Sequence, residues 1–200
     1  MLNVNSIVFD YPDVRLLQDI SFTVNAGCML HLQGGNGSGK TTLLKLLAGL
    51  IRPEEGHIDY DGVSIHNDIS SYQRRLGYVG HKTGVSRCLT VQEHCRFELQ
   101  NDGLGLSMEE LMEAFSLDGL QDVECGLLSQ GQRRRVGLLR LLMSDASLWL
   151  LDEPLVALDK QAVDSLTQFI HIHLARGGQV VLTSHQPLPL SAGHCMEYHL

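Results

Sequence analysis

Short apolar runs typical of buried strands recur along the chain. Such runs, bounded by glycine and polar residues, fit strands that are covered on both faces of a sheet. The runs cover Val4–Tyr11, Ile20–Val24, Met29–Gln33, a short segment around Ile58, Leu76–Gly80, Leu148–Leu151 and Gln179–Thr183. Helical patterns separate several of these runs, so the sequence predicts an α/β core built on a mainly parallel sheet.

Helical periodicity appears in three parts of the chain. Thr41–Leu50 follows a glycine-rich turn, and Ala162–Ala175 is closed by a Gly-Gly pair. The middle, about residues 90–144, is mostly helical, and Ser107 followed by two glutamates fits a helix start. This helical middle interrupts the series of strands, so we interpret it as an inserted lobe.

Length and composition fit one soluble domain. A chain of 200 residues that is 44% hydrophobic can bury a sizeable core. We expect a single domain over residues 1–200, with a core lobe of about 1–89 and 145–200 and a helical lobe of about 90–144.

Charge and cysteine usage narrow the class of protein. A net charge of −8 disfavours nucleic-acid binding through overall electrostatic attraction. No stretch approaches the roughly 20 apolar residues that cross a bilayer, and the first residues lack a secretory signal. The five cysteines are scattered, which suits reduced cytosolic thiols. His171 and His173, two apart in a predicted helix, do not share a face, so packing or surface roles are favoured over metal binding.

One segment fits the phosphate-loop pattern G-x-x-x-x-G-K-[ST]. It lies between a predicted strand and a predicted helix, which separates it from an ordinary glycine-rich turn. Its backbone N–H groups would converge on phosphate oxygens. Lys40 would add charge at the β/γ-phosphates, and the Thr41 hydroxyl would ligate Mg²⁺. The expected nucleotide-binding residues are Gly34, Gly35, Asn36, Gly37, Ser38, Gly39, Lys40, Thr41 and Thr42.

Two carboxylates, Asp152 and Glu153, end the predicted strand Leu148–Leu151. In open parallel sheets, ligands bind at the carboxyl ends of the strands. Asp152 would hold Mg²⁺ through water, and Glu153 would orient or deprotonate the attacking water. An acidic junction before a turn is the alternative, which the nearby phosphate loop disfavours.

A second glycine-containing helix start is Ser129-Gln130-Gly131-Gln132. Ser129 and Gln132 alone fit a capping box, which leaves Gly131 unexplained because glycine weakens a helical turn. Close approach of a phosphate to the backbone would explain it. One nucleotide cannot easily reach both glycine-rich segments of one chain. Two facing copies solve this, since each Ser129 segment then closes over the other copy's phosphate loop in a two-fold dimer.

Taken in order, these motifs resemble the ABC ATPase family over nearly the whole chain. The resemblance implies a P-loop NTPase with a RecA-like α/β core, an antiparallel β segment and a helical lobe. It implies Val156–Asp159 as the D-loop, with Asp159 at its end, and His185 as the γ-phosphate switch histidine. As an isolated residue, His185 would more often be structural. Tyr11 matches the adenine-stacking aromatic residue, with a packed strand tyrosine as the alternative.

One position departs from the family pattern. His81 occupies the Q-loop slot, where the family usually has glutamine that reaches Mg²⁺ and links the site to a membrane subunit. A neutral imidazole can replace that hydrogen bonding, whereas a protonated imidazole would repel the metal.

A narrower resemblance, carried by residues 80–90, 128–135, 148–159 and 180–186, is to the haem-exporter ATP-binding subunits of cytochrome c maturation. Gln130 and the Leu155-Val156 pair depart from that subfamily. The resemblance implies MgATP as substrate, a homodimer bound to integral membrane subunits at the cytoplasmic face of the bacterial inner membrane, and only indirect contact with haem. Rival interpretations are an ABC ATPase for another cargo and a soluble ABC ATPase without membrane subunits. A P-loop kinase has no use for the Ser129 segment.

A basic run, Arg133-Arg134-Arg135, opens the helix after the Ser129 segment, where the helix dipole disfavours cations. We interpret it as a solvated face with acidic neighbours. The functional alternative is an electrostatic contact to a membrane subunit or to the opposite protomer.

Overall fold

The computed structural model describes residues 1–12, 14–96, 104–185 and 195–200. The elements along the chain are β1 (Leu2–Tyr11), β2 (Val14–Val24), β3 (Met29–Gln33), α1 (Lys40–Leu47), β4 (Glu55–Tyr60), β5 (Val63–Ser64), α2 (Ile69–Arg74), β6 (Leu76–Val79), α3 (Val91–Arg96), α4 (Met108–Ala114), α5 (Gln130–Met143), β7 (Leu148–Asp152), α6 (Lys160–Ala175), β8 (Gln179–Thr183) and β9 (Cys195–His199). No helix among these residues is long and apolar enough to cross a membrane.

The centre of the molecule is a parallel sheet with strand order β6-β7-β8-β3-β9. Because strand side chains alternate between faces, the side chains of β7 pack into two separate hydrophobic cores, one on each face of the sheet. Trp149 and Leu151 pack with α4, α5 and α6, whereas Leu148 and Leu150 pack with α1 and the antiparallel strands. Burial on both faces explains the continuous apolar runs of the sequence.

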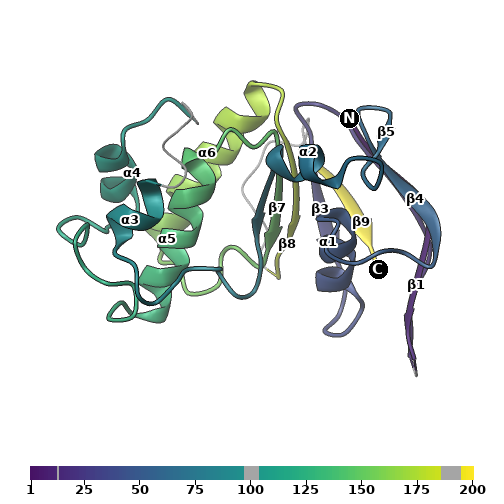
Figure 1. Cartoon of the computed structure of the whole chain (residues 1–200), viewed down its shortest axis with the longest axis horizontal. Helices are drawn as coiled ribbons and strands as arrows, with labels where there is room; N and C mark the ends of the chain where they lie inside the picture. The colour runs from purple at the N-terminus through teal and green to yellow at the C-terminus, as the bar shows by residue number, and fades with distance from the viewer. Residues whose placement is uncertain (13, 97–103, 186–194) are drawn as a thin grey trace.

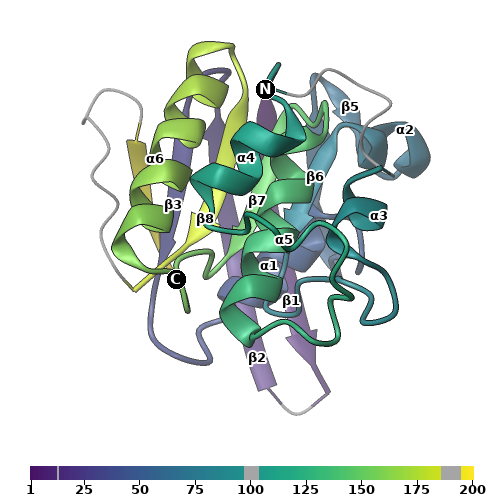
Figure 2. The same cartoon turned by 90° about the vertical axis from the view of Figure 1, so that its left-hand side faces the viewer.

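The layers on the two sides of this sheet differ in kind. Figure 1 shows the helices α3 to α6 on one side, and α1 followed by the second sheet on the other. In Figure 2, α4, α5 and α6 cross in front of β3, β7 and β8. The second sheet is antiparallel, with order β2-β1-β4-β5. The carboxyl ends of β3, β7 and β8 therefore point toward one edge, where the predicted site residues lie.

The helical middle is less helical than we predicted. Residues 115–129 between α4 and α5 form turns and a single bridge rather than a helix. Gly119, with a φ of 73°, lies in this stretch, and glycine in such a conformation ends regular helix. The helix predicted over Thr41–Leu50 ends at Leu47 for the same reason, because Gly49 has a φ of 65°. The start at Ser107 is confirmed as a capping box with Glu110.

His173 is a packing residue, as expected from its spacing. Its ring stacks on the Trp149 indole at 3.8 Å between centroids, and it is 6% exposed. Burial lowers the pKa of His173 to about 4. The pair joins α6 to β7 near the amino end of that strand.

Candidate active site

The phosphate-loop segment forms the turn from β3 into α1, as predicted. Gly34, Gly37 and Gly39 have φ values of 149°, 84° and 97°, a region that side-chain-bearing residues rarely adopt. A Cβ at Gly34 would lie 2.5 Å from the Ser38 Oγ, and one at Gly39 would lie 2.8 Å from the side chain of Leu17. These glycines therefore fix a tight loop that other residues cannot form.

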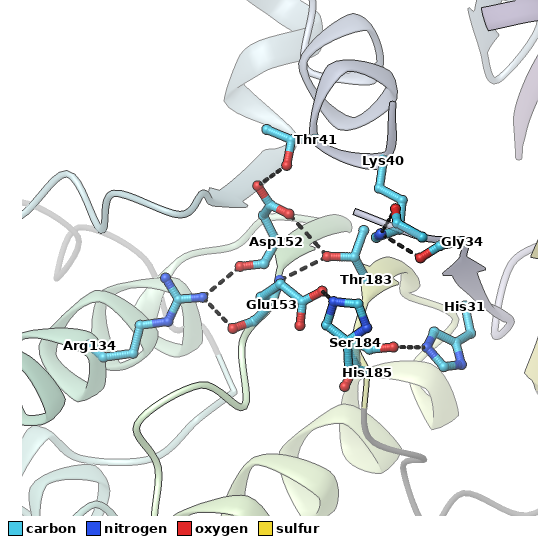
Figure 3. A network of polar contacts seen from close by, with 11 residues as sticks. His31, Gly34, Lys40, Thr41, Arg134, Asp152, Glu153, Thr183, Ser184 and His185 are labelled. Atoms are coloured by element: carbon cyan, nitrogen blue, oxygen red, sulfur yellow. Dashed lines mark hydrogen bonds and ion pairs between the residues drawn. The ribbon is translucent and has the colours of Figure 1, made fainter. Parts of the chain in front are cut away.

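Lys40 folds back over this loop. Its Nζ donates to the carbonyl oxygens of Gly34 and Gly35 at 2.7 and 2.9 Å (Figure 3). The residue before α1, Gly39, provides no side-chain cap to the helix. The start of α1 thus combines an uncapped helix N-terminus with an ammonium group, an arrangement suited to an anion.

Asp152 sits at the carboxyl end of β7 and is 2% exposed. Its Oδ2 accepts from the Thr41 hydroxyl at 2.9 Å, and its Oδ1 accepts from the Thr183 hydroxyl at 3.0 Å. The Thr183 oxygen in turn accepts from the backbone N–H of Glu153 at 2.9 Å. These hydrogen bonds join α1 to the carboxyl ends of β7 and β8 in one network (Figure 3). A hydroxyl and a carboxylate side by side form an oxygen donor set that fits Mg²⁺.

Glu153 has a left-handed backbone with a φ of 51°, which is uncommon for a residue with a side chain. Its Oε1 is buried without a hydrogen-bond partner among the described residues and lies 3.6 Å from the His185 Nε2. His185 is itself largely exposed, and its chain position is fixed because the His31 ring donates to the Ser184 carbonyl at 3.0 Å. Glu153 and His185 are thus brought together at the same edge (Figure 3).

The basic run does not form a solvated face, although the acidic neighbours expected with it are present, since Arg135 pairs with Asp159. Arg134 is 6% exposed, and burial lowers its pKa, opposed by the nearby carboxylates of Asp152 and Glu153. Arg135 donates to the Phe115 carbonyl and to the Asp159 carboxylate, and Arg133 donates to the Leu128 carbonyl. Each arginine meets acceptors within the chain around the first turn of α5, which sequence spacing does not reveal.

Ser129 caps α5 in the way that the simpler alternative describes. Its Oγ accepts from the Gln132 N–H at 3.1 Å, and the Gln132 side chain accepts from the Ser129 N–H at 2.8 Å. Gly131 also has a local cause, because a Cβ there would lie 2.9 Å from the Ala157 carbonyl oxygen. The D-loop region therefore constrains Gly131 within a single chain, a contact that the sequence did not predict.

Asp159, at the end of the predicted D-loop, caps α6. Its Oδ1 accepts from the Ala162 N–H at 2.9 Å, and this bond together with Arg135 lowers its pKa. The D-loop thus contacts α5 twice, through Gly131 and through Arg135. The Ser129 segment, which we also call the signature segment, therefore lies against the D-loop.

Tyr11 lies at the tip of the β1–β2 hairpin. It is 46% exposed and meets Phe9 edge-on at 5.2 Å, so the ring is not packed in the core. The same hairpin contacts the phosphate loop, since Leu16 and Leu17 border Gly39. The packed-tyrosine alternative does not describe this ring.

His81 lies on a cleft of about 680 Å³ beside the catalytic edge. The cleft is also lined by Gln130, Asp152 and Glu153. The predicted Q-loop residue, Gln130 of the signature segment and the two carboxylates therefore share one cleft. Asn36 and Thr42 belong to the loop and to α1, and Thr42 is buried.

Three residues of the site were missed by sequence reasoning. Thr183 carried a weak signal, because it ends an apolar strand at the carboxyl edge. His31 lies inside a strand and Arg134 inside a charge run, so their partners Ser184 and Glu153 follow only from the fold.

Comparison with known proteins agrees with this arrangement. Residues 17–156 match the ABC transporter family. The chain is 52% identical, over its full length and that of the relative, to the cytochrome c biogenesis ATP-binding export protein CcmA of Legionella pneumophila (strain Lens). It is 42% identical over 188 residues to the protein of that name from Escherichia coli O157:H7, covering 94% of this chain and 90% of that one. The structure of an ATP-binding subunit of an ABC transporter matches with a TM-score of 0.85, at 26% identity over 92% of this chain and 79% of that chain.

These matches confirm the predicted fold and the predicted ATPase activity. The matched region includes the phosphate loop, the Ser129 segment and the Asp152-Glu153 pair. The chain therefore belongs to the ABC transporter family of ATPases, and within it to the family of CcmA cytochrome c biogenesis ATP-binding export proteins.

Proposed function

We propose that this chain hydrolyses ATP by in-line attack of water on the γ-phosphate, with catalysis that comes mainly from positioning and charge stabilisation. The phosphate loop and Lys40 bind the phosphates, and Tyr11 stacks on the adenine. The supporting observation is the hydrogen-bonded network that joins Thr41, Asp152, Thr183 and Glu153 at one edge of the sheet.

Thr41 and Asp152 hold Mg²⁺ in this proposal. The Thr41 hydroxyl donates its hydrogen to Asp152, so an oxygen lone pair stays available for a cation. Mg²⁺ held by these residues would supply positive charge against the negative charge of the phosphates.

Glu153 orients the attacking water and accepts its proton. The carboxylate is suited to this because its Oε1 is buried, accepts no hydrogen bond from the residues that the structure describes, and lies close to His185. His185 contacts the γ-phosphate from the end of β8, and His81 takes the place of the usual glutamine beside the ion. The backbone of Glu153 is fixed from the N–H side by Thr183.

Two copies of the chain bind two nucleotides between them. Ser129, Gln130, Gly131 and Gln132 of each copy close over the phosphates bound by the other, and Asp159 lies in the adjoining D-loop. The Ser129 hydroxyl accepts one hydrogen bond in its capping box and still has a hydrogen to donate to a phosphate oxygen.

Hydrolysis powers an ABC membrane complex for haem export or haem-chaperone handling in cytochrome c biogenesis. The full-length identity of 52% to a cytochrome c biogenesis export protein supports this assignment. In this proposal the dimer binds integral membrane subunits at the cytoplasmic face of the inner membrane and contacts haem only indirectly. The chain works as one domain over residues 1–200, with core lobe about 1–89 and 145–200 and helical lobe about 90–144.

The catalytic assignment is tested by Glu153→Gln. We expect this variant to bind ATP, to lose at least about 100-fold in turnover, and to accumulate as an ATP-bound dimer on size-exclusion chromatography. Near-normal turnover would remove Glu153 from the proposed role.

The membrane assignment is tested by affinity purification of this subunit from solubilised membranes. We expect integral membrane proteins in the eluate, together with the Soret absorbance of haem. A subunit that elutes without membrane proteins would support the soluble ABC ATPase alternative, and membrane partners without haem would support a different cargo.

A further inference from the structure

Arg134 connects α5 to the catalytic edge of the sheet. Its Nη2 donates to the carbonyl oxygens of Asp152 and Glu153 at 2.6 and 2.7 Å. Its Nη1 donates to the Gly80 carbonyl oxygen at 2.7 Å and, at a longer 3.4 Å, to the backbone carbonyl oxygen of His81. Figure 3 shows the side chain extending from α5 toward the backbone of Asp152 and Glu153. One guanidinium therefore spans the ends of β6 and β7 and the residues that follow them.

Burying this charge is costly unless the surroundings compensate for it. With 6% exposure, Arg134 has lost most of its water, and the backbone carbonyls supply the acceptors in its place. A planar fork of donors suits several acceptors at fixed directions, whereas a lysine ammonium is a single point charge. The geometry thus depends on the guanidinium group and not only on its charge.

The carbonyls that Arg134 binds flank a strained position. Glu153 has a φ of 51°, a conformation that persists only where neighbouring contacts hold it. Thr183 accepts from the N–H of Glu153, while Arg134 donates to the carbonyls of Asp152 and Glu153. The peptide that carries the proposed catalytic carboxylate is therefore held from both sides.

We propose that Arg134 is a positioning residue for ATP hydrolysis. It fixes the backbone of Glu153 and links that backbone to α5. This inference rests on the proposed role of Glu153. Arg134 lies one turn beyond Gly131 on α5, the helix that begins at the Ser129 segment. A shift of α5 on contact with the opposite nucleotide is thereby transmitted to the Glu153 peptide of the same chain.

The test compares Arg134→Ala and Arg134→Lys with a matched control, Arg140→Ala, which removes an arginine six residues further along the same helix. We expect both Arg134 variants to lose about tenfold or more in kcat, because displacement of a catalytic group is costly. Their ATP affinity, measured by equilibrium dialysis, stays within about twofold of the parent, since no phosphate contact is removed. The control keeps kcat within about twofold.

Chemical rescue separates positioning from a general loss of structure. Millimolar ethylguanidinium should restore part of the kcat of Arg134→Ala and leave Arg140→Ala and Glu153→Gln unchanged. Arg134→Lys keeps the charge and most of the side-chain volume. If the alanine variant does not fold, the kcat of Arg134→Lys therefore tests the positioning role. Parent-like kcat in Arg134→Lys would overturn the inference, as would parallel losses of kcat and ATP affinity without rescue.

Glu153→Gln in the same assay separates the two proposals. If Glu153→Gln retains turnover, the catalytic assignment itself fails. If Glu153→Gln is slow while the Arg134 variants match the parent, only the positioning role is lost.

Discussion

The two glycine-containing helix starts of this protein are satisfied in opposite ways. At α1, Gly39 provides no side-chain cap, and Lys40 lies over the loop carbonyls. At α5, the capping box of Ser129 and Gln132 satisfies two backbone N–H groups within the chain. We call the first an open start, because it has no side-chain cap and is suited to an anion. We call the second a finished start, because its cap is supplied within the chain. In the proposed dimer this difference is expected, because the Ser129 segment must keep its shape while no nucleotide of the opposite copy faces it.

The largest effect is expected at the open start. Lys40→Ala removes the ammonium that the loop holds, so we expect ATP turnover to fall by about 100-fold or more. ATP affinity should fall with it, because in the proposed mechanism the lysine contacts the phosphates in both the bound state and the transition state. Turnover assays and equilibrium dialysis measure the two losses. Unchanged ATP affinity would mean that the two helix starts are less different than their geometry indicates.

A smaller effect is expected at Gly131, in the finished start. Gly131→Asn and Gly131→Asp both place a Cβ against the Ala157 carbonyl and have similar volume, but only aspartate adds a negative charge. Both should reduce turnover, by about tenfold for asparagine and further for aspartate, because the charge repels the opposite γ-phosphate. ATP binding by the isolated subunit should stay near the parent value. Equal turnover of the two variants would assign the loss to strain within one chain.

The capping boxes give a matched pair of still smaller changes. Ser129→Ala and Ser107→Ala each remove the cap of one helix, and each should lower the free energy of unfolding by about 1 kcal/mol. Only Ser129→Ala should also reduce ATP turnover. Urea denaturation and turnover assays together test this. A similar loss of turnover in both variants would show that helix stability, and not phosphate contact, is the cause.

The smallest effect is expected in the cleft that Gln130 shares with His81. His81→Gln restores the residue usual in the ABC ATPase family, and glutamine offers the same kinds of hydrogen-bonding atoms as a neutral imidazole. We expect turnover of the membrane-bound complex to stay within about twofold of the parent. A dead glutamine variant would contradict the assigned equivalence.

Sequence reasoning succeeded where the signal is local. The strands Met29–Gln33 and Gln179–Thr183 are confirmed with their predicted bounds, because apolar runs between turn residues are local patterns. The helix start at Ser107 and the capping box at Ser129 are local patterns for the same reason. The predicted site roles themselves stay predictions, although the structure brings Lys40, Thr41, Asp152 and Glu153 together.

Sequence reasoning failed where a partner is distant along the chain. Arg134 contacts the Gly80 carbonyl across 54 positions, and a run of arginines in isolation is typical of a wet surface. Gly131 meets Ala157 only because the D-loop returns beside α5. The strand β9 pairs in parallel with β3, a neighbour that no local pattern identifies. Each of these contacts depends on the topology of the sheet.

The stack of His173 on Trp149 makes unfolding a proton-uptake reaction. In the unfolded chain a histidine titrates near 6.5, whereas burial lowers the pKa of His173 to about 4. Between these values the unfolded state binds one more proton, so stability falls as pH decreases through this window. From pH 7 to pH 5 this single residue removes about 2 kcal/mol from the free energy of unfolding. Urea denaturation at both pH values, with His173→Gln as reference, measures the effect, and equal pH dependence in the two proteins would assign acid sensitivity elsewhere.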